Sequence, residues 1–136
     1  MIIFLKAEEQ HQHKNGGGWV ANTATVEESA YLGARAQVSD TAWVFGNARV
    51  FSNAQVSGNG RVFGNGRVFG SAQVFDNAQV SGNALVSGNG RVSGNAQVFG
   101  DAQVSGDAQV SGAAQVFGNG RLLGDYQVSG DAQVSG

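Results

Sequence analysis

One aliphatic residue recurs at every sixth position along most of this chain. From Val20 to Val134 this position is occupied twenty times, by valine in eighteen cases and by leucine in two, without an insertion. Four positions after each aliphatic residue stands Ala or Gly, with Tyr126 as the exception. A period of six fits neither the 3.6-residue turn of a helix nor the simple alternation of a strand. The pattern therefore indicates a six-residue unit that is repeated in space.

Each six-residue unit reads as a short strand followed by a corner. In residues 54–59 (AQVSGN), Ala and Val alternate with Gln and Ser, so the two apolar side chains share one side of a strand. Gly followed by Asn or Asp is typical of a turn, because both residue types tolerate left-handed backbone angles. No single unit can bury its own valine, so successive coils must stack and share one continuous core.

This spacing resembles the hexapeptide-repeat family, in which an aliphatic residue is followed four positions later by a small one. The resemblance covers residues 20–136 and implies an all-β fold, a left-handed parallel β-helix of triangular section with three hexads in each 18-residue coil. We expect residues 19–136 to form nearly seven coils without inserted loops, and residues 1–18 to form an N-terminal arm or cap with a Gly-rich linker. The opening of the repeat, with FGNARV and SGNAQV, is also similar to a subgroup of uncharacterised repeat proteins from bacteria and phages, which brings no established chemistry.

Three hexads a coil place residues eighteen apart on the same face, so the outer surface can be predicted. One face carries a ladder of Gln and Ser that includes Gln37, Gln55 and Ser57, and we interpret it as a solvated structural ladder. The other two faces carry outward aromatic residues interleaved with Arg, a composition typical of interface cores. The candidate interface residues are Trp43, Phe45, Arg49, Phe51, Arg61, Phe63, Arg67, Phe69, Phe99 and Phe117. Stacked rings can alternatively serve the coil alone through axial packing.

The predicted partner is a second copy of the chain, because most soluble oligomers are homo-oligomers and dimers are the commonest. The C-terminal coil supplies a candidate end-to-end interface at Tyr126, Val128 and Val134. An open β-helix end exposes strand edges and core, which natural proteins cover. Three alternatives stay open there: two chains meet, a foreign partner caps the coil, or the natural chain continues. At the N-terminal end the candidates for a cap are residues 1–5, Trp19 and Tyr31.

Composition narrows the classes of partner. The formal net charge is −2, so the chain has no general attraction to nucleic acid or to anionic membranes. The absence of cysteine excludes disulfides and thiolate sites and fits the cytoplasm. The apolar residues 1–5 are too few for a signal-peptide core or a membrane span. We therefore expect a cytoplasmic protein with no nucleic-acid partner and no membrane partner.

Catalytic and metal-binding side chains are sparse. The repeat contains no histidine, and His11 and His13 precede it. Two imidazole ligands on a terminal arm make only a weak transition-metal site. Asp107 and Asp125 fall one coil apart on one corner, where we expect turn stabilisation rather than a cation site. We therefore predict no catalytic residue, no metal and no cofactor.

Four functions stay open, and the favoured one is a non-enzymatic rod that associates with itself or binds a protein partner. The second is an inhibitor of phage or mobile-element type that docks its aromatic and Arg surface on a host protein. The third is an acyltransferase-like enzyme, because the hexapeptide-repeat family includes acyltransferases that use a histidine as general base. The fourth is ice binding, although ladders of Gln and Ser replace the flat Thr arrays that ice-binding proteins of this fold share.

Overall fold

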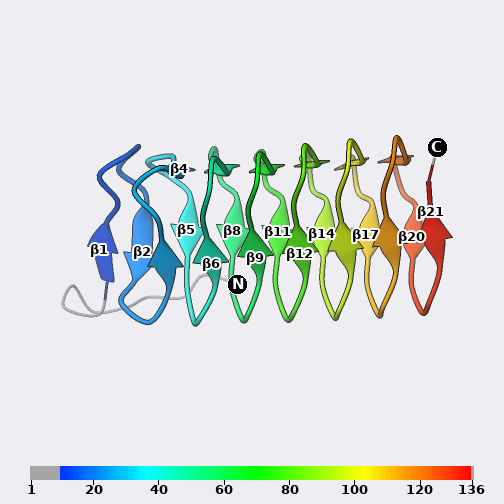
Figure 1. Cartoon of the computed structure of the whole chain (residues 1–136), viewed down its shortest axis with the longest axis horizontal. Coiled ribbons are helices and arrows are strands. Elements are labelled where there is room, and N and C mark those ends of the chain that lie inside the picture. Colours follow the sequence, from blue (N-terminus) through cyan, green and yellow to red (C-terminus); the bar gives the residue numbers. More distant parts are fainter. Residues whose placement is uncertain (1–9, 136) are drawn as a thin grey trace.

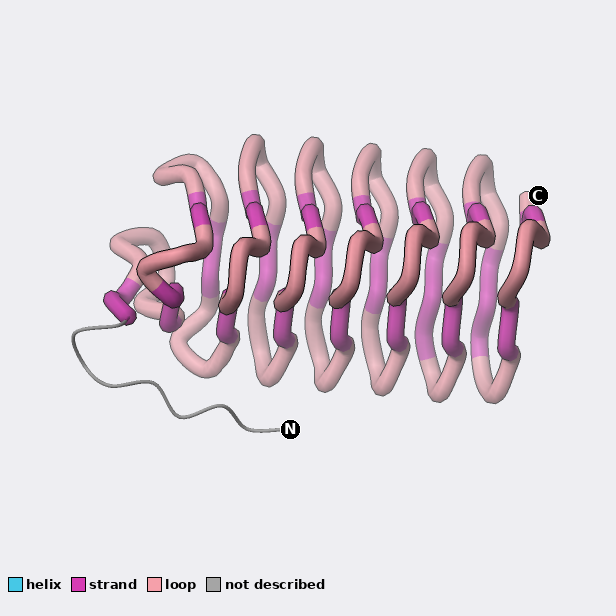
Figure 2. The backbone as a smooth tube through the Cα atoms, turned by 90° about the horizontal axis from the view of Figure 1, so that it is seen from below, coloured by secondary structure: helices cyan, strands magenta, loops and turns pink. Residues whose placement is uncertain are grey.

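A short strand centred on each aliphatic position is the unit from which the fold is built. The computed structural model describes residues 10–135, and their strands run in three parallel sheets around one axis (Figure 1). Within these residues the backbone consists of strands and turns without a helix (Figure 2). The predicted all-β solenoid with three strands in each 18-residue coil is confirmed.

We name the three sheets faces A, B and C, in the order in which the chain first enters them. Face A contains β1 (Gln10–Gln12), β2 (Trp19–Ala21), β5 (Gln37–Val38), β8 (Gln55–Val56), β11 (Gln73–Val74), β14 (Arg91–Val92), β17 (Gln109–Val110) and β20 (Gln127–Val128). Face B contains β3 (Thr25–Val26), β6 (Trp43–Val44), β9 (Arg61–Val62), β12 (Gln79–Val80), β15 (Gln97–Val98), β18 (Gln115–Val116) and β21 (Gln133–Val134). Face C contains β4 (Tyr31–Leu32), β7 (Arg49–Val50), β10 (Arg67–Val68), β13 (Leu85–Val86), β16 (Gln103–Ser105) and β19 (Arg121–Leu123).

The strands pair in the register that the period of six requires. Val74 of β11 lies opposite Val56 of β8 and Val92 of β14, each eighteen residues away. Valines and leucines from all three faces therefore meet on the axis, and the small residues close the inside of each corner. Nearly all of these side chains are fully buried, so they fill the interior.

The corners stack as closely as the strands. The first corner residue takes a left-handed conformation, as at Gly64 with φ of 62°. A Cβ on Gly64 would lie 3.1 Å from the amide nitrogen of Gly82 in the next coil. Asp40 and Asp76 adopt the same backbone conformation, with φ of 56° and 58°. Glycine predominates at this position because the backbone angle and the close approach both disfavour a side chain.

The N-terminal end of the solenoid is covered by a hairpin. Strand β1 pairs antiparallel with β2, and the turn between them is closed by a 2.7 Å hydrogen bond from the His13 amide to the carbonyl of Gly18. The amide of Gly18 donates to the Leu32 carbonyl at 3.0 Å, and a Cβ on Gly18 would collide with the Leu32 side chain. The Gly-rich segment thus lies directly on the first coil.

The predicted cap residues take a smaller part than this hairpin. Trp19 and Tyr31 occupy outward strand positions and are each 38% exposed, so their rings lie beside the coil rather than over its open end. Residues 1–5, the third candidate, lie outside the described residues. Position within a strand explains the difference, because residues that precede a buried valine point away from the core.

Candidate protein-binding faces

Face B carries a cluster of aromatic rings over its second and third coils. The ring centroids of Trp43 and Phe45 lie 4.8 Å apart, and those of Phe45 and Phe63 lie 4.9 Å apart with an interplanar angle of 3°. The guanidinium carbon of Arg61 lies 5.8 Å from the centroid of the Trp43 ring, within the range of a cation–π contact. The structure therefore brings these four predicted residues together as one group, the Trp43 cluster.

A second pair of rings stands on the same face two coils further along. Phe99 and Phe117 are stacked with centroids 5.3 Å apart and an interplanar angle of 9°. Between the two pairs, the equivalent outward position holds Ser81. Face B thus presents two phenylalanine stacks that are separated by one coil without a ring.

Face C carries the remaining predicted residues. Phe51 and Phe69 are stacked with centroids 4.9 Å apart and an interplanar angle of 2°. Arg49 and Arg67 lie directly opposite each other on neighbouring strands β7 and β10. Like charges in this arrangement repel each other, and neither guanidinium forms an ion pair within the described part of the chain. Both positive charges therefore lie at the surface without an acidic neighbour among the described residues.

Stacking changes the expected exposure of the rings. Trp43 is 41% exposed, as its outward position predicts. The six predicted phenylalanines are half-buried, because each ring covers one side of a neighbouring ring. Axial packing and an exposed aromatic edge therefore coexist on the same residues.

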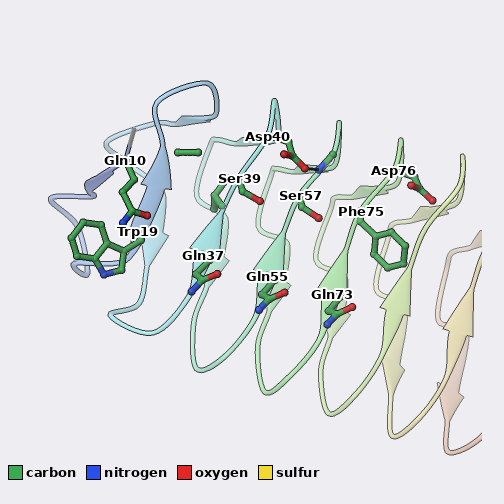
Figure 3. Close-up of a pocket in the computed structure, with 13 residues that line it drawn as sticks. Gln10, Trp19, Gln37, Ser39, Asp40, Gln55, Ser57, Gln73, Phe75 and Asp76 are labelled. Atoms are coloured by element: carbon green, nitrogen blue, oxygen red, sulfur yellow. Dashed lines mark hydrogen bonds between the residues drawn. The ribbon is translucent and has the colours of Figure 1, made fainter. Parts of the chain in front are cut away.

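Face A has a different surface, an open trough that runs along the solenoid axis (Figure 3). The trough encloses about 390 Å³. Trp19 lies at one end and Phe75 at the other, and the small side chains of Ser39 and Ser57 lie between them. The remaining polar side chains along it are Gln10, Gln37, Gln55, Gln73, Asp40 and Asp76. This row offers hydrogen-bond donors and acceptors at every coil.

The trough was not predicted from the sequence. The sequence pattern indicates a solvated Gln and Ser ladder on face A and gives Phe75 no special place. The available signal was the column in which Ser39 and Ser57 precede the larger Phe75, with Trp19 at the start of the neighbouring column. Small outward residues that lie between two rings indicate a depression, once the two columns are compared along the axis.

Polar corner residues of successive coils form hydrogen-bonded ladders, and some of the acidic side chains take part in them. The Asn59 amide donates to Asn77 at 3.1 Å, and Asn77 donates to Asn95 at 3.2 Å. Asn89 donates to the carboxylate of Asp107 at 3.0 Å. The structure describes no group of three or more His, Asp or Glu residues that could hold a metal ion. Asp107 therefore takes part in stabilising a corner.

The two histidines do not converge on one site. The imidazole Nδ1 of His11 is 2.7 Å from the Asn22 side-chain oxygen at the surface. His13 is buried, with its Nε2 2.8 Å from the carbonyl oxygen of Ala30. The second arrangement ties the N-terminal hairpin to the first coil. Both imidazoles thus have structural partners within the N-terminal end.

The last coil is more open than the coils before it. Tyr126 is 59% exposed at a position where the repeat elsewhere places a buried Ala or Gly, and Ala132 of the same coil is exposed as well. The amide of Gln109 still donates to the carbonyl of Tyr126 at 2.9 Å, which keeps the coil in register. Val128 and Val134 pack against the core but are only partly buried. These are the three residues of the predicted end-to-end interface.

Membrane-spanning helices are not found. Across residues 10–135, no helix reaches the length and apolar character that crossing a bilayer requires.

Comparison with known proteins supports the repeat architecture. Two overlapping pairs of segments, residues 72–88 with 78–94 and residues 96–112 with 102–118, match the model of a family described as the YdcK beta solenoid repeat. Each segment begins at the small residue inside a corner and spans three strands, the same unit as one coil. Curated proteins and solved structures give no match. The chain is therefore a parallel β-solenoid repeat protein, similar over its central coils to the YdcK repeat.

Proposed function

We propose that this β-solenoid is a non-enzymatic assembly rod that binds a second copy of itself through its aromatic surface. The observation that carries the proposal is the Trp43 cluster, in which Trp43, Phe45 and Phe63 stand on a flat sheet face beside Arg61. Trp, Phe and Arg are enriched in interface cores, and exposed apolar patches of this kind mark partner surfaces.

The interior supports binding on the outside rather than inside the protein. Its valines and alanines are buried throughout the central coils, which leaves no internal pocket there for a small substrate. The grooves that exist are open and lie along the faces. A flat, rigid face suits a macromolecular partner, because little conformational entropy is lost when it docks.

The area of one face limits the affinity that can be expected for the dimer. A face of seven strands spans roughly 30 Å by 13 Å, about 400 Å² on each copy, which is below the roughly 800 Å² per partner of a standard specific interface. We therefore expect a weak, readily exchanging dimer with a dissociation constant in the micromolar range or higher.

The proposal is tested by the mass of the protein in solution over a concentration series. Light scattering from a few to several hundred micromolar should show a rise from 14.0 kDa toward twice that mass. The variant Trp43→Ser should shift the rise to higher concentration, and Phe75→Ser on face A is the matched control. A constant monomer mass at all concentrations would refute self-association, and a foreign protein would then become the partner to seek.

A further inference from the structure

One outward column of face B, the residues that follow the buried valines, reads the same in both directions over coils two to six. The positions that follow the buried valines hold, in order of coils two to six, Phe45, Phe63, Ser81, Phe99 and Phe117. The two flanking stacks have similar geometry, with centroid separations of 4.9 Å and 5.3 Å. The row is symmetric about Ser81 on strand β12 in chemistry and in spacing.

This symmetry lets like residues meet across a two-fold interface. In an isologous dimer, residue i of one copy meets residue j of the other, and j meets i in return. We infer that two copies pack face B against face B in antiparallel orientation, about a two-fold axis that lies between the two faces, parallel to β12 and over Ser81. The inference rests on the proposed function and adds its geometry.

Such an axis brings each ring opposite another ring. Rotation about this axis leaves each residue in its own eighteen-residue column but reverses the order of the coils. Phe63 therefore meets Phe99 of the second copy, and Phe45 meets Phe117. Serine meets serine at the centre, where the missing rings leave room. Aromatic pairs in contact add to burial of apolar area, which favours this register over one shifted by a coil.

The preceding column fits the same arrangement. Strand pairing places Trp43 and Arg61 on coils two and three, and Gln97 and Gln115 on coils five and six. The proposed axis sets Arg61 opposite Gln97 and Trp43 opposite Gln115. A guanidinium then faces an amide oxygen instead of a second positive charge.

Charge along the rod also favours antiparallel packing. Residues 41–75 contain three arginines and no acidic residue. Residues 95–129 contain Asp101, Asp107 and Asp125 against one arginine. Antiparallel packing sets the basic segment 41–75 of each copy beside the acidic segment 95–129 of the other, and parallel packing sets the two basic segments together.

Face C does not show this symmetry. Its equivalent row is Gly33, Phe51, Phe69, Ser87, Ser105 and Leu123. A two-fold axis over β7, β10 or β13 would set at least one ring opposite a serine or a glycine, and an axis midway between β7 and β10 would set Arg49 opposite Arg67. Face C therefore supplies the natural comparison for testing face B.

The geometry can be measured by distances between spin labels, because the chain has no cysteine of its own. Single cysteines are introduced at Ser81, at Thr25 on the first coil of face B and at Ser87 on face C. Labels at 81 should lie close together, since packed sheets are about 10 Å apart. Position 25 lies three coils from the two-fold axis in each copy. Two labels there should therefore be separated by roughly 29 Å along the length of the rod, at about 4.8 Å for each coil.

The outcomes separate the geometry from the proposed function. Short distances at both 81 and 25 would indicate a parallel dimer and overturn the antiparallel inference. A short distance at 87 with a long one at 81 would place the interface on face C and overturn it too, while self-association stands. A monomeric mass without an intermolecular signal at any position would refute both.

A second measurement uses the C-terminal half of face B. The variant Phe99→Ser should raise the dimer dissociation constant about as much as Phe63→Ser, because each ring meets the other across the axis. An interface confined to the Trp43 cluster would leave Phe99→Ser unchanged, and that result would overturn the inference. Melting temperatures of both variants check that the rod itself is intact.

Discussion

Faces A and B cover the same core and yet present opposite surfaces. Beneath both, a column of buried valines repeats every eighteen residues, as in Val56 and Val74 under face A or Val62 and Val80 under face B. Outside, face A has an open row of Gln and Ser side chains, and face B has two phenylalanine stacks and a tryptophan. Inward positions thus determine the fold, and outward positions determine what the rod contacts.

The largest effect expected comes from placing a charge on either side of one strand. Val80→Asp puts a carboxylate into the filled core and should destabilise the rod by about 3–5 kcal/mol, the cost of an uncompensated buried charge. Its neighbour Ser81→Asp points outward and should leave the free energy of unfolding within about 0.5 kcal/mol. Denaturant titration measures both. Equal losses would contradict the separation of inward and outward roles.

The two faces should differ next in self-association. Replacing Phe63 and Phe99 by serine removes one ring from each stack of face B and should weaken the dimer at least about 30-fold, the size of a hot-spot loss near 2 kcal/mol. Phe75→Ser on face A should leave the dissociation constant unchanged. Sedimentation velocity over a dilution series gives both values. If Phe75→Ser weakened the dimer as much as the face B variant does, the proposed difference between faces A and B would be wrong.

Substitution of a corner glycine should lower the free energy of unfolding by an intermediate amount, whichever faces the corner joins. Gly94 has φ of 63°, and a Cβ there would approach the amide of Gly112 at 2.8 Å. Gly94→Ala should therefore cost about 1–2 kcal/mol, the usual penalty of left-handed backbone for a residue with a side chain.

Aspartate at the same position supplies the matched control. The carboxylate of Asp76 accepts a 3.0 Å hydrogen bond from the amide of Gly94 in the next coil, and Asp40 accepts one from Gly58 at 2.9 Å. Gly94→Asp can repeat this contact toward Gly112 and should cost about 1 kcal/mol less than Gly94→Ala. Thermal unfolding of the two variants decides the matter, and an alanine variant as stable as the aspartate would disprove this role of the carboxylate.

The smallest effect expected concerns the amide ladders at the corners. Asn77 both receives and donates a side-chain hydrogen bond, and its exposed position makes each bond worth little. Asn77→Ala should lower the free energy of unfolding by about 0.5–1 kcal/mol without affecting the dimer. Ala113 occupies the equivalent position two coils further on, so replacing it by asparagine is the converse test.

The periodic part of the fold could be predicted from sequence, and the exceptions to the period could not. A buried valine every sixth residue determines the strands, the register and the core, because each follows from stacking alone. Tyr126 occupies an inward position by spacing but is 59% exposed in the last described coil, an exposure that the period does not indicate. The antiparallel hairpin at β1 lies before the repeat, where no period indicates its pairing.

The surface was predictable only in part. Columns of residues eighteen apart correctly brought Trp43, Phe45, Arg61 and Phe63 together. The degree to which stacked rings cover each other depends on side-chain rotation, so their half-buried state did not follow from the pattern. The trough on face A depends on side-chain volumes over several coils, which a residue-by-residue interpretation does not combine.

The central claim is that face B is a surface for self-association, and sedimentation equilibrium tests it most directly. The account predicts that the weight-average mass rises from 14.0 kDa toward twice this value with increasing concentration, and that the variant lacking Phe63 and Phe99 stays near the lower value throughout. A wild-type mass that remains at 14.0 kDa at several hundred micromolar would contradict it.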